Sequence, residues 1–331
     1  MKIVLPGGSG HLGQLLTATL SARGDEVVVL SRGRMGAART VAWDGHTAGP
    51  WERELDGADA VINLAGRSVN CRYTAANLRA MLDSRIDSTR AVGAAIARAS
   101  RPPRVWLQSS TATIYAHRFD APNDDLTGFL GGHEPDAPGY WKTSIDIATG
   151  WERALAEAAT PRTRKVALRS AMVMWPGKGG PFGMMLALTR AGLGGALGGG
   201  RQFVSWIHGL DFVRAVVWLL EHDELAGPVN LASPSPLPQR DFMRALRTAA
   251  GVPLGLPATR WMLELGALFL RTDTELVLKS RRVVPRRLTD SGFRFEFPDW
   301  PTAARDLVGR AHRARVSRYS AIGTASKPFW P

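Results

Sequence analysis

A glycine-rich turn between two short apolar runs constrains this chain more than any other feature. Residues 1–5 are mostly apolar, residues 6–13 read Pro-Gly-Gly-Ser-Gly-His-Leu-Gly, and a second apolar run at 26–30 follows a helical pattern over 14–23. The order strand, glycine turn, helix, strand within about thirty residues is typical of a dinucleotide-binding βαβ unit. The sequence therefore predicts a parallel sheet with a nucleotide site at its first turn.

The three regularly spaced glycines would each have a separate role in this turn. We expect Gly7 to let the chain turn off the strand, Gly10 to let a pyrophosphate approach the backbone, and Gly13 to seat the helix closely. The N–H groups of the helix start, at His11 and Leu12, would face the diphosphate. The spacing is G-x-x-G-x-x-G, and an ordinary βα turn without a ligand is the alternative.

The end of the second strand predicts which dinucleotide is bound. NAD-preferring sites usually carry Asp or Glu there to take the ribose hydroxyls, whereas this chain has Ser31-Arg32. A guanidinium can bind a 2′-phosphate through charge-assisted hydrogen bonds, and a carboxylate would repel it. We therefore expect NADP(H) rather than NAD(H), with a solvated arginine at a strand end as the alternative.

Composition argues against several other classes of protein. The chain has 331 residues, one cysteine and a net charge of +13, and its basic residues are scattered. We expect no internal disulfide and no nucleic-acid partner. No apolar run could span a membrane, no His/Cys cluster has metal-ligand spacing, and the N-terminal run does not resemble a signal peptide. These features predict a cytoplasmic protein with a small-molecule substrate; the oligomeric state stays open, with a homodimer as one option.

The first half of the chain alternates strands and helices. Further strands are expected at 40–44, 59–66, 105–111 and 165–173, with helices at 51–55, 74–99 and 140–158. This alternation predicts an α/β fold with a doubly wound parallel (Rossmann) sheet, covered by helices on both faces. The strand ends Asn63-Leu64-Ala65-Gly66 and Ser109 are expected to lie against the cofactor.

Beyond residue 174 the pattern predicts a smaller α+β substrate lobe. The expected elements are a strand near 202–208, a helix at 212–220 with Asp211 as its N-cap, a strand at 229–232, helices near 238–250 and 258–280, an alternating strand through Phe293, Phe295 and Phe297, and a helix at 301–312.

These elements suggest three parts of the chain. The NADP-binding domain would span 1–174, with later segments returning to it, and the substrate lobe with the C-terminal domain would span 175–312. A basic and then polar tail would follow at 313–331. The glycine-rich run 192–200 would be either a mobile flap over the substrate or a tight connection.

Together these stretches resemble the extended branch of the short-chain dehydrogenase/reductase superfamily. More narrowly, they resemble an epimerase-like group with a small C-terminal domain of unknown function, of the DUF1731 type. The matching residues are Gly7 to Gly13, Asn63 to Gly66, Ser84-Arg85, Trp151-Glu152, residues 194–208 with Asp211, residues 275–285, Leu288 and residues 292–295. The resemblance covers about residues 1–310 and implies NADP(H) binding, with a substrate that is generally not established.

The resemblance also implies where catalytic groups would lie. In this superfamily a hydroxyl after the fifth strand acts with a Tyr-x-x-x-Lys helix, which exchanges a proton with the substrate while the nicotinamide exchanges the hydride. Thr111 falls on the hydroxyl position. Counting back from Glu152, the tyrosine and lysine positions fall on Ser144 and Ala148, so this chain lacks the pair.

Other residues are candidates for the site. Tyr140 could supply the acid or base, or it packs at the solvent edge. His208 could face the substrate from the end of its strand, or it is bonded to a backbone carbonyl. Arg72, Arg85 and Arg169 could bind an anionic substrate, or they are solvated or ion-paired.

Two functions follow from this combination of features. The first is an NADP(H)-dependent oxidoreductase or epimerase-like enzyme that acts on a small polar molecule. The alternative is a non-catalytic NADP(H)-binding sensor or scaffold protein, because the Tyr-x-x-x-Lys pair is missing.

Overall fold

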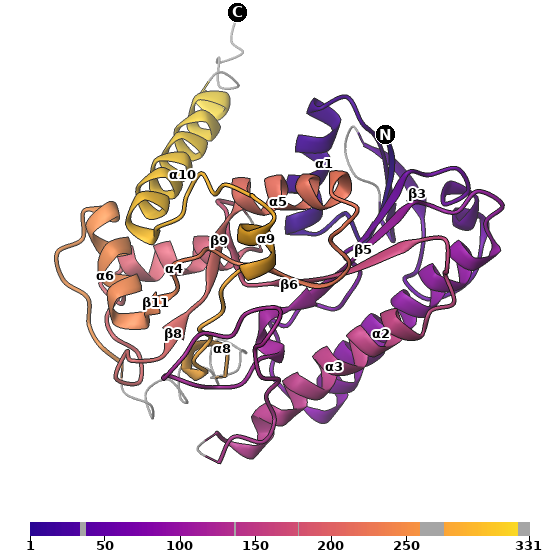
Figure 1. Ribbon diagram of the computed structural model, residues 1–331. Helices are drawn as coiled ribbons and strands as arrows, with labels where there is room; N and C mark the ends of the chain where they lie inside the picture. The colour runs from indigo at the N-terminus through magenta and orange to yellow at the C-terminus, as the bar shows by residue number, and fades with distance from the viewer. Residues whose placement is uncertain (34–37, 136, 178, 259–274, 324–331) are drawn as a thin grey trace, which may run out of the picture.

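A seven-stranded parallel sheet forms the centre of the computed structural model, which describes residues 1–33, 38–135, 137–177, 179–258 and 275–323 (Figure 1). The strand order is β10-β6-β5-β4-β1-β2-β3. The strands are β1 (Lys2–Pro6), β2 (Glu26–Ser31), β3 (Arg39–Ala42), β4 (Ala60–Asn63), β5 (Val105–Thr111), β6 (Arg164–Ser170) and β10 (Gly227–Leu231). The order reverses between β1 and β4, which is where folds of this kind bind ligands. The predicted doubly wound α/β fold is therefore confirmed.

Helices cover both faces of the sheet because successive strand side chains point to opposite faces and both sets are apolar. Ile3 and Leu5 share one core cluster with α1 (His11–Ala22) and α5 (Gly209–Glu221). Val4 lies in the other cluster, with α2 (Ala75–Arg98) and α3 (Lys142–Glu157), which run side by side in Figure 1. Each fully buried side chain of this size stabilises the fold by about 1.5–3 kcal/mol.

The sequence predicted most elements of the first half of the chain to within a few residues. One predicted strand was wrong in its extent. The expected strand at 165–173 divides into β6 and the short β7 (Met172–Met174). β7 leaves the main sheet and pairs with β9 (Trp206–His208) of the smaller lobe. The helix expected at 51–55 is the 3₁₀ turn η1 (Pro50–Glu54). Two further 3₁₀ turns are η2 (Ala112–Ile114), after β5, and η3 (Gly139–Trp141), before α3.

The smaller lobe has its own aromatic core. Its elements are α4 (Pro181–Arg190), β8 (Phe203–Val204), β11 (Leu237–Pro238), α6 (Gln239–Ala250) and α10 (Trp300–Gly323). The Phe242 and Trp300 rings stack with centroids 3.9 Å apart, and Trp206 packs against Trp300 at 5.0 Å. These rings hold α6 and α10 against the strands of the lobe.

The predictions of Asp211 as an N-cap and of a strand at 293–297 were both wrong, because the Asp211 carboxylate bonds to the backbone of that segment. His208, not Asp211, is the N-cap of α5, and its ring nitrogen accepts the N–H of Leu210. The buried Asp211 carboxylate instead accepts the N–H groups of Glu296 and Phe297. Because those amides bond to a side chain rather than to another strand, the alternating phenylalanines at 293–297 form no strand.

The C-terminal segments differ from expectation in extent. Of the helix expected at 258–280, residues 259–274 lie outside the described residues, and α8 (Glu275–Leu278) is helical. A short α9 (Arg286–Asp290) follows, and α10 continues to Gly323, into the part expected to be a tail. Within the run 192–200, Gly195 is tightly packed, since a Cβ there would lie 2.3 Å from the Leu256 carbonyl oxygen, whereas the space beside Gly192 and Gly199 is open. Among the described helices, none is long and apolar enough to cross a bilayer.

Candidate functional site

The glycine turn is held tightly on two sides. Gly7 has a φ of +75°, and a Cβ there would lie 2.6 Å from the Ala65 backbone. A Cβ on Gly13 would lie 2.2 Å from the carbonyl oxygen of Gly8. The backbone at both positions is therefore too close to its neighbours for any side chain, as expected for a turn that seats a helix on a sheet.

Gly10 differs from these two glycines because the space beside it is open. It is the N-cap of α1, with an ordinary φ of −72°, and the nearest atom to a Cβ there would be the Gly7 oxygen, 3.8 Å away. His11 packs against the backbone of Gly177 and Gly180, and Leu12 packs on the sheet core. The backbone at the helix start is thus open beside Gly10, and the N–H groups and the dipole of a helix start favour an anion.

The end of β2 borders this turn. The Ser31 hydroxyl donates to the Ser9 hydroxyl at 2.9 Å, which ties the strand end to the glycine turn. Arg32 follows directly and is exposed, and among the described residues it has no hydrogen-bond or ion-pair partner. Arg32 is thus an exposed guanidinium without a partner among the described residues, next in the chain to the strand end that bonds to the turn.

The end of β4 is fixed by buried amides. Asn63 is fully buried, its Nδ2 donates to Gln108 at 3.0 Å, and its Oδ1 accepts the N–H of Ala65. The N–H of Leu64 donates to the Pro6 carbonyl at 2.8 Å. These bonds hold the segment from Asn63 to Gly66 against β1, at the switch point of the sheet.

A buried ion pair supports the end of β5. Ser110, not Ser109, points inward and donates to Glu152 at 2.6 Å. Glu152 also pairs with Arg169 at 2.8 Å. Burial alone would lower the pKa of Arg169, but hydrogen bonding and attraction from Glu152 raise it overall. The Arg169 guanidinium therefore has its partners inside the protein and is not available to a substrate.

Thr111, at the carboxyl end of β5, lies beside an ionisable cluster. The Thr111 hydroxyl accepts the N–H of Thr113 at 3.1 Å, and the Thr113 carbonyl accepts a hydrogen bond from Lys279 at 2.9 Å. The Ser144 hydroxyl of α3 donates to Glu275 at 2.5 Å. The Lys279 ammonium is 3.8 Å from the same Glu275 carboxylate. Groups from β5, α3 and the C-terminal segment therefore meet here.

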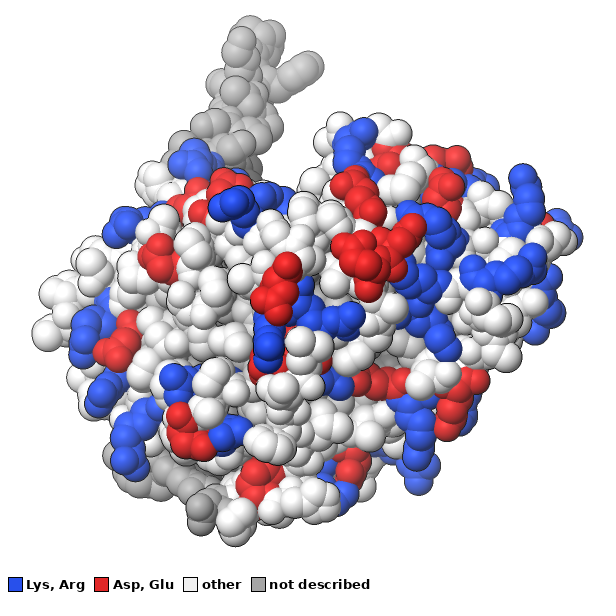
Figure 2. All heavy atoms as spheres, viewed as in Figure 1, with Lys and Arg blue, Asp and Glu red and all other residues white. Residues whose placement is uncertain are grey.

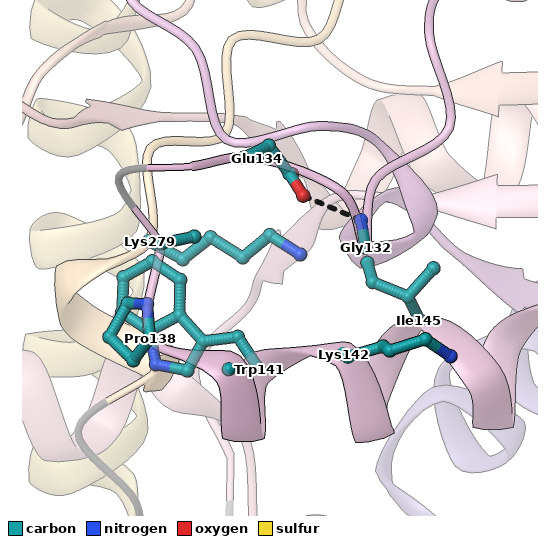
Figure 3. A pocket seen from close by; sticks show the side chains of 9 residues that line it. Gly132, Glu134, Pro138, Trp141, Lys142, Ile145 and Lys279 are labelled. Carbon is teal, nitrogen blue, oxygen red and sulfur yellow. Dashed lines mark hydrogen bonds between the residues drawn. The ribbon is translucent and has the colours of Figure 1, made fainter.

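Burial changes the acidity of Lys279. Its pKa is lowered to about 8, first by burial and then by the neighbouring Arg281, while Glu275 opposes the shift. Figure 3 shows the side chain extending across a small pocket, lined also by Glu134 and Trp141, over the start of α3. The pocket encloses about 30 Å³, which is room for about one water molecule. An amine that titrates near neutral pH is suited to exchanging protons.

The segment that carries Lys279 is fixed firmly in place. The Ser280 N–H donates to His117 at 2.7 Å, and the Ser280 hydroxyl accepts the N–H of Phe203. The Asn123 N–H donates to the Arg282 carbonyl, and Asn123 accepts the N–H of Val284 in return. The C-terminal segment is therefore clamped between β8 and the loop after β5.

The arginines of this segment have partners within the chain. Arg281 donates to Thr113, Arg282 to the carbonyls of residues 119 and 120, and Arg287 to those of residues 226 and 228. Arg286 lies near Asp124 and Asp290. On the face shown in Figure 2, basic and acidic side chains are interspersed rather than gathered in one patch.

The two other acid/base candidates differ in their surroundings, and Tyr140 lies between Gly139 and Trp141, which line the pocket of Lys279. Tyr140 is half exposed, on the 3₁₀ turn before α3. His208 is fully buried, stacks on Phe297, and bonds to Asp306 at 3.1 Å. Burial lowers the pKa of His208 to about 4. This placement favours a structural role for His208 over a catalytic one.

Sequence reasoning missed Glu275, Lys279 and Ser144 as members of one site. Glu275 and Lys279 are four residues apart, which places them on one side of a helical turn, but they follow Ser144 by more than 130 residues. The signal was present in the C-terminal block of family resemblance, where a buried-looking run carries both charges. Nothing in that run indicated which part of the sheet it would contact.

The fold and the glycine turn define a Rossmann-type dinucleotide-binding protein. Residues 3–232 match the NAD dependent epimerase/dehydratase family, and residues 258–307 match the domain of unknown function DUF1731. The chain belongs to the NAD dependent epimerase/dehydratase family. The resemblance found in the sequence is thus confirmed.

Several relatives match almost the whole chain. The Epimerase family protein SDR39U1 of Bos taurus is 34% identical over 313 residues, which is 93% of this chain and 100% of the relative. The Epimerase family protein YfhF of Bacillus subtilis is 30% identical, over 93% of this chain and 98% of its own. The crystal structure of human SDR39U1 (isoform 2) with NADPH has a TM-score of 0.81 and 29% identity, and covers 93% of this chain and 99% of its own.

Proposed function

We propose that this protein is an NADP(H)-dependent oxidoreductase or epimerase-like enzyme that acts on a small polar molecule. The observation that carries the proposal is the open backbone at Gly10, between two glycines that fix the turn around it. A diphosphate would occupy that space and bond to the N–H groups of the α1 start. When bound, the nicotinamide would supply the hydride.

The choice of NADP(H) is supported by Arg32 and by a relative. Arg32 is exposed beside the turn, and no carboxylate ends β2. A 2′-phosphate would meet a positive charge there rather than a negative one. The similar human SDR39U1 was crystallised with NADPH. We infer the same preference for this chain.

Proton exchange would fall to the groups around Thr113. Lys279 can hold or release a proton near neutral pH, and Glu275 is the carboxylate beside it. In a carbonyl reduction, the hydride would add to the carbonyl carbon and Lys279 would donate a proton, through the Ser144 hydroxyl or a water, to the oxygen. The Thr111 hydroxyl would orient that oxygen. Glu275 and Lys279 would thus replace the missing Tyr-x-x-x-Lys pair.

One observation favours the second candidate, a non-catalytic NADP(H) sensor. The tyrosine and lysine positions of α3 are occupied by Ser144 and the fully buried Ala148, so the usual acid and base are absent from that helix. A sensor would bind the dinucleotide and transfer no hydride.

A titration followed by a turnover screen would test the proposal. We expect the protein to bind NADPH more tightly than NADH in a calorimeter, and to oxidise NADPH with at least one small carbonyl compound. Glu275→Gln should keep the affinity for NADPH and lose turnover. Absence of binding to either nucleotide would contradict the proposal, whereas NADPH binding without turnover over a broad carbonyl library would favour the sensor.

A further inference from the structure

Arg85, on α2, is a buried guanidinium without an acidic partner. Only 9% of the residue is exposed. It donates a hydrogen bond to the Met81 carbonyl at 2.9 Å, and its guanidinium lies 4.9 Å from the centre of the Trp151 ring. No carboxylate among the described residues pairs with it. A buried charge without a counter-charge costs several kcal/mol, so an unpaired guanidinium is kept at the expense of stability.

The place of Arg85 in the fold relates it to the nucleotide turn. A Cβ on Gly66 would lie 3.4 Å from the Arg85 side chain and 3.5 Å from its guanidinium carbon. Gly66 ends the segment whose Ala65 backbone contacts Gly7. Arg85 therefore borders the segment that lies at the switch point between β1 and β4, and a side chain at position 66 would contact it.

The charged surroundings of Arg85 contain no carboxylate among the described residues. The titratable groups that influence its pKa are Tyr73 and Cys71, which both lie just before α2. Glu275, on the C-terminal segment, is held instead by Ser144 and Lys279. No carboxylate of the described residues therefore offsets the charge of Arg85.

We propose that Arg85 binds the anionic group, a carboxylate or a phosphate, of the small molecule that reacts beside the dinucleotide. This inference rests on the proposed function, because it places a substrate at the switch point. A guanidinium presents a planar fork of N–H groups that matches two oxygens of either anion. The cation–π contact with Trp151 restrains the position of the guanidinium. The substrate class is then a carboxylated or phosphorylated carbonyl or hydroxy compound.

The same chemistry could come from the phosphates of the dinucleotide, so the experiment must separate the two sources. Malonate and inorganic phosphate are the probes, each titrated by calorimetry at constant ionic strength, with and without NADPH. Arg85→Met removes the charge and keeps a long apolar side chain on Trp151. Arg67→Met is the matched control, because Arg67 is a nearby exposed arginine whose guanidinium bonds to Asn77 at 2.9 Å.

We expect the wild type and Arg67→Met to bind at least one probe equally well. Arg85→Met should bind it about tenfold to hundredfold more weakly, as the loss of charge-assisted hydrogen bonds implies, with unchanged affinity for NADPH. If Arg85→Met does not fold, Arg85→Lys serves as the test variant. Lysine keeps the positive charge but lacks the planar guanidinium, so it should weaken probe binding as well.

Three results would overturn the inference. The first is equal probe affinity in the wild type and in the Arg85 variant. The second is loss of NADPH affinity in that variant, which would assign the anion to the dinucleotide. The third is a wild type that binds NADPH and neither probe, which would leave the proposed function standing. Conversely, the protein could bind a probe in an Arg85-dependent way and bind no NADPH. That result would support the anion site and contradict the proposed function.

Discussion

The Ser144 hydroxyl donates a 2.5 Å hydrogen bond to the buried carboxylate of Glu275, across a separation of 131 residues in the sequence. Counted back from Glu152, Ser144 falls on the position expected for the tyrosine of the superfamily, and Glu275 belongs to the C-terminal segment that matches DUF1731. The bond therefore links the position of the absent acid to a part of the chain outside the epimerase match.

Glu275→Gln should make Lys279 a stronger acid. Glu275 opposes the effect of burial on Lys279, so removing its negative charge should lower the lysine pKa further below about 8, by about one unit or more. The measurement is an NMR titration of protein with labelled lysine side chains. Ser144→Ala is the control, since it removes the hydrogen bond and keeps the charge. An unchanged Lys279 pKa in Glu275→Gln would show that the charge of Glu275 does not influence Lys279.

Arg32→Asp should change the choice between dinucleotides. The new carboxylate would repel a 2′-phosphate and accept ribose hydroxyls, so affinity for NADPH should fall about tenfold to hundredfold while affinity for NADH holds or rises. Arg53→Asp is the matched control, because Arg53 is also exposed but lies on η1. Parallel losses for both nucleotides would remove the case for phosphate recognition by Arg32.

The glycines of the turn should respond differently to substitution. Gly10→Val should fold normally, because its backbone is ordinary and its surroundings are open, and should lose NADPH binding because the side chain fills the phosphate space. Gly13→Ala should lower stability as well, since its Cβ would overlap the Gly8 carbonyl. Thermal unfolding and calorimetry on the same samples check both effects.

Gly49 provides a control position for the substitutions at Gly10 and Gly13. Gly49→Val changes another extended N-cap glycine, where a Cβ meets the Trp51 ring at 3.5 Å, so it should alter neither property. Retained NADPH affinity in Gly10→Val would move the nucleotide site away from this turn.

The sequence predicted the features that depend on local pattern. The β1 turn, the alternation of strands and helices and the helix α2 follow from glycine spacing and from apolar periodicity within a few turns of chain. The same local information placed Ser31, Arg32 and Thr111 at strand ends, and the parallel sheet then brings those ends to one edge.

What the sequence could not show depends on contacts between distant segments. Asp211 precedes a helical pattern in the sequence, as an N-cap does, but its carboxylate is taken by the amides of Glu296 and Phe297, far along the chain. The partnership of Ser144 with Glu275 is likewise a product of tertiary packing. Periodicity predicts which faces are apolar, not which remote segment covers them.

His208 provides the last prediction, in which protein stability depends on pH. The ring stacks on Phe297, its Nδ1 accepts the N–H of Leu210, and its Nε2 therefore carries the proton that is shared with Asp306. Burial holds the folded pKa at about 4, whereas the unfolded residue titrates near 6.5. Between these values the unfolded chain binds more protons, so stability should fall as the pH drops from 6.5 to 4, by about 3 kcal/mol from this residue.

His208→Asn isolates that contribution, because asparagine can cap α5 in the same way and cannot titrate. The variant should be less stable than the wild type at pH 7, since it loses the stacking and the bond to Asp306, but the difference should shrink as the pH falls towards 4. Urea unfolding at several pH values gives the free energy of unfolding of both chains. Their carboxylates titrate alike, so the difference between the two free energies reports the contribution of His208. A constant difference across this range would mean that His208 has the same pKa in the folded and unfolded chains, which would contradict the effect assigned to burial.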